Sequence, residues 1–332
     1  MLVVLDDALF RDEQADDVAL LTVICEGKDR YKVCTRPAYR PAAREGVNWW
    51  LAQQSPRVQA VVRIVLEQGF KAPPYSPPGA PREPQIIVEH RDAPEWPDSF
   101  ESGPARLPLA SARELLLRPL RLLLENGRND WSFLAKIVPS AWKARWRLAV
   151  EKRWIEEQNA GGITEMRRII EVQLALDPVR RLRTWAMFDS DGQLPGDASD
   201  QARDAKAACE TWQIAHHRLR RRAIENYIPK EVLTDWAWRR HHLADKREMA
   251  ARVRAYCELE TDGDRHHLDM KERFHKHLAQ HVWGDGELDF GGRPIVYQVS
   301  DDALVRDGFG VGQGSDKLGE REELFQTLFS RL

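Results

Sequence analysis

Two short apolar runs, each followed at once by acidic residues, constrain this chain more than any other feature. The run from Leu120 to Leu124 ends at Glu125, and the run from Arg183 to Phe188 ends at the sequence D-S-D-G. Runs this short and apolar are typical of strands that are covered on both faces of a parallel sheet. Helical apolar spacing lies between them, which predicts right-handed crossovers. The predicted fold class is therefore α/β, with a mostly parallel sheet flanked by helices.

Composition divides the 332 residues into three parts. Residues 1–109 are predicted to form an N-terminal α/β domain with a proline-rich connector at 71–84, because proline lacks an amide donor and fixes φ. Residues 110–240 carry the acidic strand ends, and residues 241–332 are predicted to be mainly helical. We expect strands at Leu20 to Cys25, Tyr31 to Cys34 and Ile86 to Val88, helices at Val58 to Gln68, Asp130 to Val138 and Ala141 to Gln158, a glycine-rich loop at Gly308 to Gly314 and a last helix from Glu320 to Arg331.

The overall charge excludes a protein that holds nucleic acid by a general basic field. Lys and Arg total 50 and Asp and Glu total 52, so a polyanion partner needs a local basic patch or metal ions. No apolar run reaches the roughly 18 residues of a membrane span, and the first residues lack the pattern of a signal peptide. The four cysteines show no disulfide or zinc spacing. We expect a cytoplasmic protein with no membrane partner.

The acidic residues at the strand ends predict a metal site. Carboxyl ends of parallel strands meet at one edge of a sheet, so Glu125, Asp189 and Asp191 are expected to lie together. Hard divalent ions such as Mg²⁺ and Mn²⁺ take oxygen ligands, and two carboxylates in a D-x-D sequence can share or bridge such ions. The alternative is that D-S-D-G is only a turn in which an aspartate caps the next helix.

Several segments together resemble the Toprim fold of topoisomerases, primases and OLD (overcoming lysogenization defect) nucleases. They are L-L-L-E-N-G-R-N-D over residues 122–130, G-G at 161–162 before a helix, and F-D-S-D-G over 188–192. R-R-R-A-I-E-N-Y over 220–227 is similar to the R-x-I-E-N-Y segment of OLD-like and related stand-alone Toprim nucleases. The resemblance covers residues 119–230. The family usually has E-G-x-x-D, whereas this chain has one more residue between Glu125 and Asp130.

The resemblance implies a nuclease that hydrolyses DNA or RNA phosphodiesters at a site for Mg²⁺ or Mn²⁺. The implied metal ligands are Glu125, Asp130, Asp189, Asp191 and Glu225. Lys271 is the implied late lysine that neutralises charge in the transition state, and Arg220, Arg221 and Arg222 would bind phosphates. Such nucleases commonly work with an ABC-type ATPase in anti-phage defence, and the lack of a Walker motif here implies that the ATPase is a separate chain.

Three alternatives remain open from the sequence. The altered E-N-G-R-N-D motif also suits a catalytically silent Toprim-like subunit for nucleic-acid binding or assembly. The arginine segment also suits a solvated helix face with an internal ion pair. Glu26 and Glu89 also follow apolar runs, but Glu26 lies so far before Asp189 that it would need a domain-sized insertion. Nine histidines between His216 and His281 lack zinc spacing, and a partly charged surface facing an anionic partner is the expected role.

Overall fold

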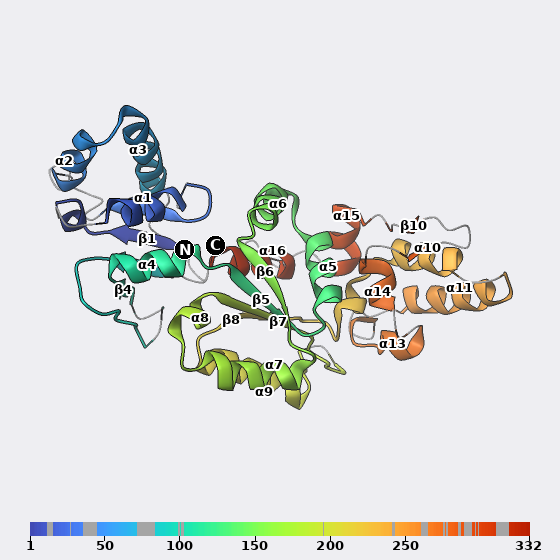
Figure 1. The fold of residues 1–332 in the computed structure, drawn as a ribbon. Helices are drawn as coiled ribbons and strands as arrows, with labels where there is room; N and C mark the ends of the chain where they lie inside the picture. The colour runs from blue at the N-terminus through green and yellow to red at the C-terminus, as the bar shows by residue number, and fades with distance from the viewer. Residues whose placement is uncertain are drawn as a thin grey trace.

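The computed structural model describes residues 1–11, 16–26, 28–35, 45–71, 84–98, 100, 103–194, 196–240, 243–259, 265–274, 276, 278–284, 287–288, 294–295, 297, 299–309 and 319–332. Most of the expected proline-rich connector at 71–84 and of the glycine-rich loop at 308–314 lies outside these residues. Figure 1 shows an N-terminal lobe, a second sheet beside it, and helices α10 and α11 at the far end. No helix in the described ranges is both long and apolar enough to cross a membrane.

The N-terminal lobe is a parallel four-stranded sheet with strand order β2-β1-β3-β4. Its strands are β1 (Leu2–Leu5), β2 (Lys32–Thr35), β3 (Gln85–Val88) and β4 (Ala105–Leu107). Its helices are η1 (Asp7–Phe10), α1 (Asp17–Glu26), α2 (Glu45–Gln53), α3 (Pro56–Lys71) and α4 (Leu109–Leu117). The α/β class predicted for this part is confirmed. The expected strand at Leu20 to Cys25 is wrong, because this segment is α1 and buries its apolar side chains as a helix.

The second sheet has the same strand order, β6-β5-β7-β8, and is also wholly parallel. Its strands are β5 (Leu120–Leu124), β6 (Ile155–Asn159), β7 (Thr184–Phe188) and β8 (Ala215–Arg218). Between them lie α5 (Arg128–Ile137), η3 (Ser140–Trp142), α6 (Lys143–Glu151), α7 (Ile163–Arg168), η4 (Ile169–Leu174), α8 (Pro178–Leu182) and α9 (Asp200–Thr211). The expected helix over Ala141 to Gln158 is wrong in its second half, where the chain forms β6.

The remaining elements pack against this sheet rather than forming a separate core. They are η5 (Ile224–Tyr227), α10 (Lys230–Arg240), α11 (Leu243–Cys257), α13 (Met270–Arg273), α14 (Leu278–Trp283), β9 (Glu287–Leu288), β10 (Pro294–Ile295), α15 (Asp301–Ala303), η6 (Leu304–Phe309) and α16 (Glu320–Phe329). One buried apolar cluster runs from Leu120 to Leu332. A second cluster holds the N-terminal sheet together with α4, and it also takes in Leu182 of α8 from the second lobe. A third cluster packs α7, η4 and α9 against the second sheet.

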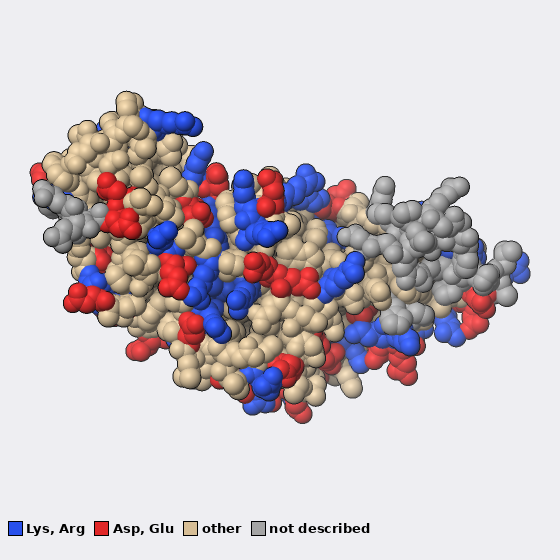
Figure 2. All heavy atoms as spheres, viewed as in Figure 1, with Lys and Arg blue, Asp and Glu red and all other residues tan. Residues whose placement is uncertain are grey.

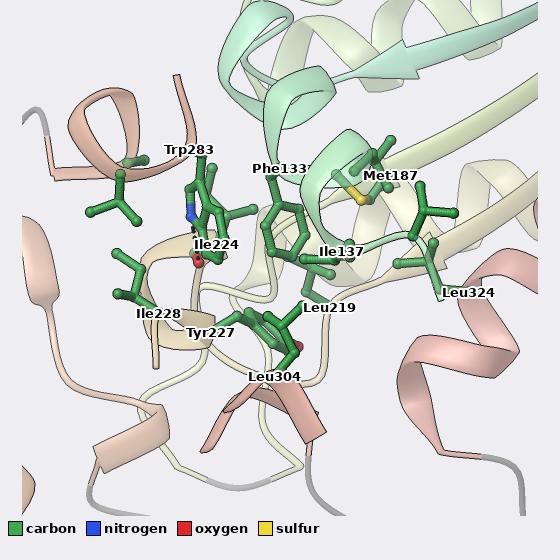
Figure 3. Packing of buried hydrophobic residues seen from close by; sticks show 14 of the residues in the cluster. Phe133, Ile137, Met187, Leu219, Ile224, Tyr227, Ile228, Trp283, Leu304 and Leu324 are labelled. Carbon is green, nitrogen blue, oxygen red and sulfur yellow. Dashed lines mark hydrogen bonds between the residues drawn. The ribbon is translucent and has the colours of Figure 1, made fainter. Parts of the chain in front are cut away.

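Aromatic packing joins α5 to the elements that follow β8 (Figure 3). The ring of Phe133 lies 5.7 Å from the ring of Tyr227 and 5.1 Å from that of Trp283. Trp283 also donates a hydrogen bond to the Ile224 carbonyl over 3.3 Å. Residues of α5, η5 and α14 therefore share one core, which holds η5 beside the carboxyl edge of the sheet.

A buried carboxylate fixes α16 against β8 and η5. Glu320 is only 4 % exposed, and its Oε1 accepts hydrogen bonds from the Arg220 amide (2.7 Å) and the Tyr227 hydroxyl (2.8 Å). The His217 ring lies 3.2 Å from the same oxygen. Burial raises the pKa of Glu320, but these partners outweigh that effect and hold its pKa below the usual value.

We expect Glu320→Ala to lower the free energy of unfolding by about 3–5 kcal/mol, because it leaves buried partners without an acceptor. Denaturant unfolding checks this. Glu323→Ala is the matched control on the same helix, since it removes an exposed ion pair with Arg220 and should cost less than about 1 kcal/mol. Equal losses in the two variants would contradict the structural role given to Glu320.

Candidate metal and phosphodiester site

The acidic residues that follow β5 and β7 lie together because these strands are neighbours. Leu124 is paired with Met187, so both strands end at the same edge. The Asp189 amide donates a hydrogen bond to Glu125 Oε2 over 3.3 Å. Glu125 and Asp189 are therefore adjacent, as the sequence predicts for the carboxyl edge of a parallel sheet.

The loop after β7 has a shape that its sequence explains. Asp191 has a φ of 49°, a value that aspartate tolerates better than most residues, and its amide donates to the Arg222 carbonyl over 2.9 Å. A Cβ on Gly192 would lie 2.4 Å from the Asp197 carbonyl oxygen, so only glycine fits there. Ser190 donates to the Arg221 carbonyl over 2.7 Å. These contacts tie the D-S-D-G loop to the arginine segment.

Asp130 lies in the first turn of α5, beside Glu125 in space. Its Oδ2 accepts a hydrogen bond from the Asn126 amide over 2.8 Å, so the additional residue of the E-N-G-R-N-D motif forms a turn that is closed by Asp130. Burial, together with the negative charges of Glu125 and Glu225, raises the pKa of Asp130 to about 7, against the opposing effect of the Asn126 amide.

Glu225 reaches the same edge from η5, with Lys271 of α13 beside it. Glu225 is 2 % exposed, and its Oε1 lies 3.6 Å from Lys271 Nζ. Its Oε2 is buried and has no hydrogen-bond partner. A carboxylate oxygen that is buried without a donor is costly, and a bound cation would satisfy it.

The electrostatics show that these groups form one cluster. Burial raises the pKa of Asp189 well above its usual value, and the nearby charges of Glu125, Asp130 and Glu225 raise it further. Burial also raises the pKa values of Glu125 and Glu225. Burial alone would lower the pKa of Lys271, but the surrounding carboxylates outweigh this and raise it. Lys271 therefore stays protonated and positively charged among these carboxylates.

Two positioning residues were not identified from the sequence. The side-chain amide of Asn226 donates to the carbonyls of Arg265 (3.3 Å) and Leu268 (3.1 Å), which holds the segment before Lys271. Asp269 caps α13 through the Glu272 amide and forms an ion pair with Arg222 at 2.7 Å. The E-N-Y sequence pointed to Asn226, but nothing local pointed to a contact with residues about 40 positions away.

The three arginines take different positions. Arg221 is buried, its guanidinium donates to the Asn226 carbonyl over 2.6 Å and covers the Tyr227 ring, so it stabilises η5 from within. The Arg220 side chain is 60 % exposed and pairs with Glu323. Arg222 is partly exposed and pairs with Asp269. Arg220 and Arg222 can reach an external phosphate, whereas Arg221 is placed for a structural role.

The alternatives to Glu125 that the sequence leaves open lie outside the acidic cluster. Glu26 ends helix α1 rather than a strand, and Glu89 pairs with Arg106 at 2.9 Å in the N-terminal lobe. Of the described histidines, His217, His267 and His281 are buried among protein groups, which does not agree with the expected charged surface. His267, for example, contacts the Gly192 carbonyl at 3.1 Å.

The ligand chemistry of the cluster suits Mg²⁺ or Mn²⁺. All five acidic members offer oxygen, and Glu225 Oε2 is a buried oxygen without a partner. Within the described residues, no group of three or more His, Cys, Asp and Glu side chains lies close enough together to hold a metal ion. The residues that would hold such ions are Glu125, Asp130, Asp189, Asp191 and Glu225.

We expect the stability of the metal-free protein to fall as pH rises from about 4 to about 7 because of Asp130. Its pKa in the folded protein, about 7, exceeds its ordinary value of 3.8, so the folded state binds more protons in this window. Asp130→Asn should remove this loss and be more stable than the parent above pH 7 by on the order of 2–4 kcal/mol. Urea unfolding across pH measures it, and Asp204→Asn, an exposed acid on α9, is the control. A constant difference between Asp130→Asn and the parent across pH would contradict the prediction.

No protein-family model matches this chain, and no curated protein or solved structure is significantly similar to it. The geometry of the cluster is therefore the basis for any statement about function.

Proposed function

We propose that this protein is a Toprim-like, metal-dependent nuclease that hydrolyses phosphodiesters of DNA or RNA. The observation that carries the proposal is the group of five carboxylates and one lysine at the carboxyl edge of the second sheet, drawn from the turn after β5, α5, the loop after β7, η5 and α13. Carboxylates that repel one another in a buried place are costly, and two divalent cations bound between them would offset that cost.

The residues of the chain have distinct roles in this reaction. Glu125, Asp130, Asp189, Asp191 and Glu225 would hold the ions, which when bound lower the pKa of the attacking water and stabilise the leaving oxygen. Lys271 places a positive charge beside Glu225, where it offsets charge on the phosphoryl oxygens. In hydrolysis the water oxygen forms a bond to phosphorus, the bond to the leaving oxygen breaks, and that oxygen takes up a proton. Asn226 and Asp269 keep Lys271 in place.

The resemblance of residues 119–230 to OLD-like nucleases supports a place in anti-phage defence, with an ABC-type ATPase as a separate partner chain.

The second candidate function is a catalytically silent Toprim-like subunit that binds nucleic acid or assembles with the ATPase. The additional residue before Asp130 favours it, since the Asn126 amide occupies one oxygen of that carboxylate.

We expect cleavage of DNA or RNA that needs Mg²⁺ or Mn²⁺ and falls more than about 100-fold in Asp189→Ala. Removing one of several repelling carboxylates should leave the melting temperature in metal-free buffer no lower than that of the parent. Gel assays on labelled single- and double-stranded DNA and RNA, with calorimetry, measure both. Asp204→Ala is the control for an exposed acid outside the cluster. Full cleavage in EDTA would refute the proposal, and metal-independent binding without cleavage would favour the silent subunit.

We expect Arg220→Ala to weaken nucleic-acid binding and to reduce the slope of log K against log salt by about 0.9 on duplex DNA, because one phosphate contact is lost. Glu323→Ala breaks the same ion pair but keeps the cation, so it should leave the slope unchanged or steeper. Fluorescence anisotropy at several salt concentrations gives the slope. If Arg220 serves only as a structural ion-pair partner of Glu323, the two variants should have the same affinity and the same salt slope.

A further inference from the structure

A pocket lined by arginines lies at the opposite edge of the second sheet, where the two lobes meet. Its lining residues are Arg118, Pro119, Arg121, Arg180 and Arg183, and its volume is about 140 Å³. Arg121 and Arg183 are adjacent, since the Arg121 amide donates to the Arg183 carbonyl over 2.9 Å. Figure 2 shows basic side chains gathered in this junction, near the region where Figure 1 places α8.

Arg183 is the unusual member of this pocket. It is 2 % exposed, and its Nη1 donates to the Arg331 carbonyl over 2.6 Å, but its Nε and Nη2 are buried without a partner. Arg321 shows the normal situation for a buried arginine, since it donates to two carbonyls and to Asp301. Among the described residues, no carboxylate lies within ion-pair distance of Arg183 or Arg121.

Other positive charges surround Arg183. Arg331 also has a buried nitrogen without a partner, and burial together with Arg183 lowers its pKa to about 10. Burial and, to a smaller extent, Arg183 lower the pKa of Arg30, also to about 10. Both remain protonated at neutral pH. Two of the lining arginines have acidic partners, since Arg118 pairs with the exposed Glu114 and Arg180 with the partly exposed Asp177.

Guanidinium groups gathered around a cavity favour an anion. A guanidinium binds phosphate oxygens through parallel hydrogen bonds, which the exposed Arg121 and Arg180 can offer from the pocket lining, and the buried charge of Arg183 beside them adds to the attraction. A volume of about 140 Å³ accommodates several waters, and so one phosphate or diphosphate group. We propose that this pocket binds a small polyvalent phosphate, either free diphosphate or the phosphate chain of a nucleotide.

The site is separate from the acidic cluster. Arg121 and Glu125 lie four residues apart on β5, at about 3.3 Å per residue, so about 13 Å separates the two ends of the strand. Arg183 also covers the ring of Tyr31 from the N-terminal lobe, at 5.7 Å. A phosphate bound beside Arg183 would therefore strengthen the junction between the lobes, and it would not be the phosphate that reacts.

The test is binding of pyrophosphate and of ATP to the full chain in EDTA, at matched ionic strength with chloride, by isothermal titration and thermal unfolding. We expect saturable binding and a higher melting temperature with either probe or both. Binding of pyrophosphate indicates the free anion, and binding of ATP alone indicates a nucleotide. No saturable binding of either, or binding only of an oligonucleotide, would overturn the proposal.

Variants locate the site. Arg121→Gln combined with Arg180→Gln changes two exposed side chains and should weaken binding at least about tenfold. Arg147→Gln, an exposed arginine on α6, should bind like the parent. Arg183→Gln should abolish binding, and the surface double variant decides the question if Arg183→Gln does not fold. Asp189→Asn should bind like the parent, and loss of binding there would assign the anion to the acidic cluster and overturn the proposal.

Discussion

The buried carboxylate of Glu320 determines how the rest of the second lobe is assembled. It joins α16 to the end of β8 and to Tyr227 of η5 through three partners that share one oxygen. Together with the aromatic core of Phe133, Tyr227 and Trp283, this anchor holds η5 against the sheet, and η5 supplies Glu225. The acidic cluster therefore depends on a residue near the end of the chain, because a buried charge tolerates only one arrangement of its donors.

The sheet and its acidic edge could be predicted from local signals. Short, mainly apolar runs predict β5 and β7, and their adjacency then places Glu125 beside Asp189. β6 was missed because it is an edge strand whose middle residues, Glu156 to Gln158, are polar and resemble a helix face. α1 was read as a strand because its apolar residues are continuous, which happens when a helix is packed against other helices on several sides.

The parts of the site that come from beyond the sheet could not be derived from local pattern. Only the family resemblance implies Lys271, and its position depends on hydrogen bonds from Asn226 to a segment about 40 residues later. The sequence also does not predict that Arg221 is buried while Arg220 and Arg222 are exposed or partly exposed, because three consecutive arginines carry no periodic pattern. Only the packing of Tyr227 below the Arg221 guanidinium shows which of the three faces inward.

The second sheet carries unbalanced charge of opposite sign at its two ends. Carboxylates repel one another at its carboxyl edge, while at its amino edge Arg183 and Arg331 keep buried nitrogens that have no hydrogen-bond partner within the described part of the chain. Each arrangement costs folding free energy, and a chain selected only for stability would replace these groups with apolar ones. Cations at one edge and a phosphate at the other would offset both costs. The two edges are joined by strands of five residues, so ligands at either end stabilise the same sheet.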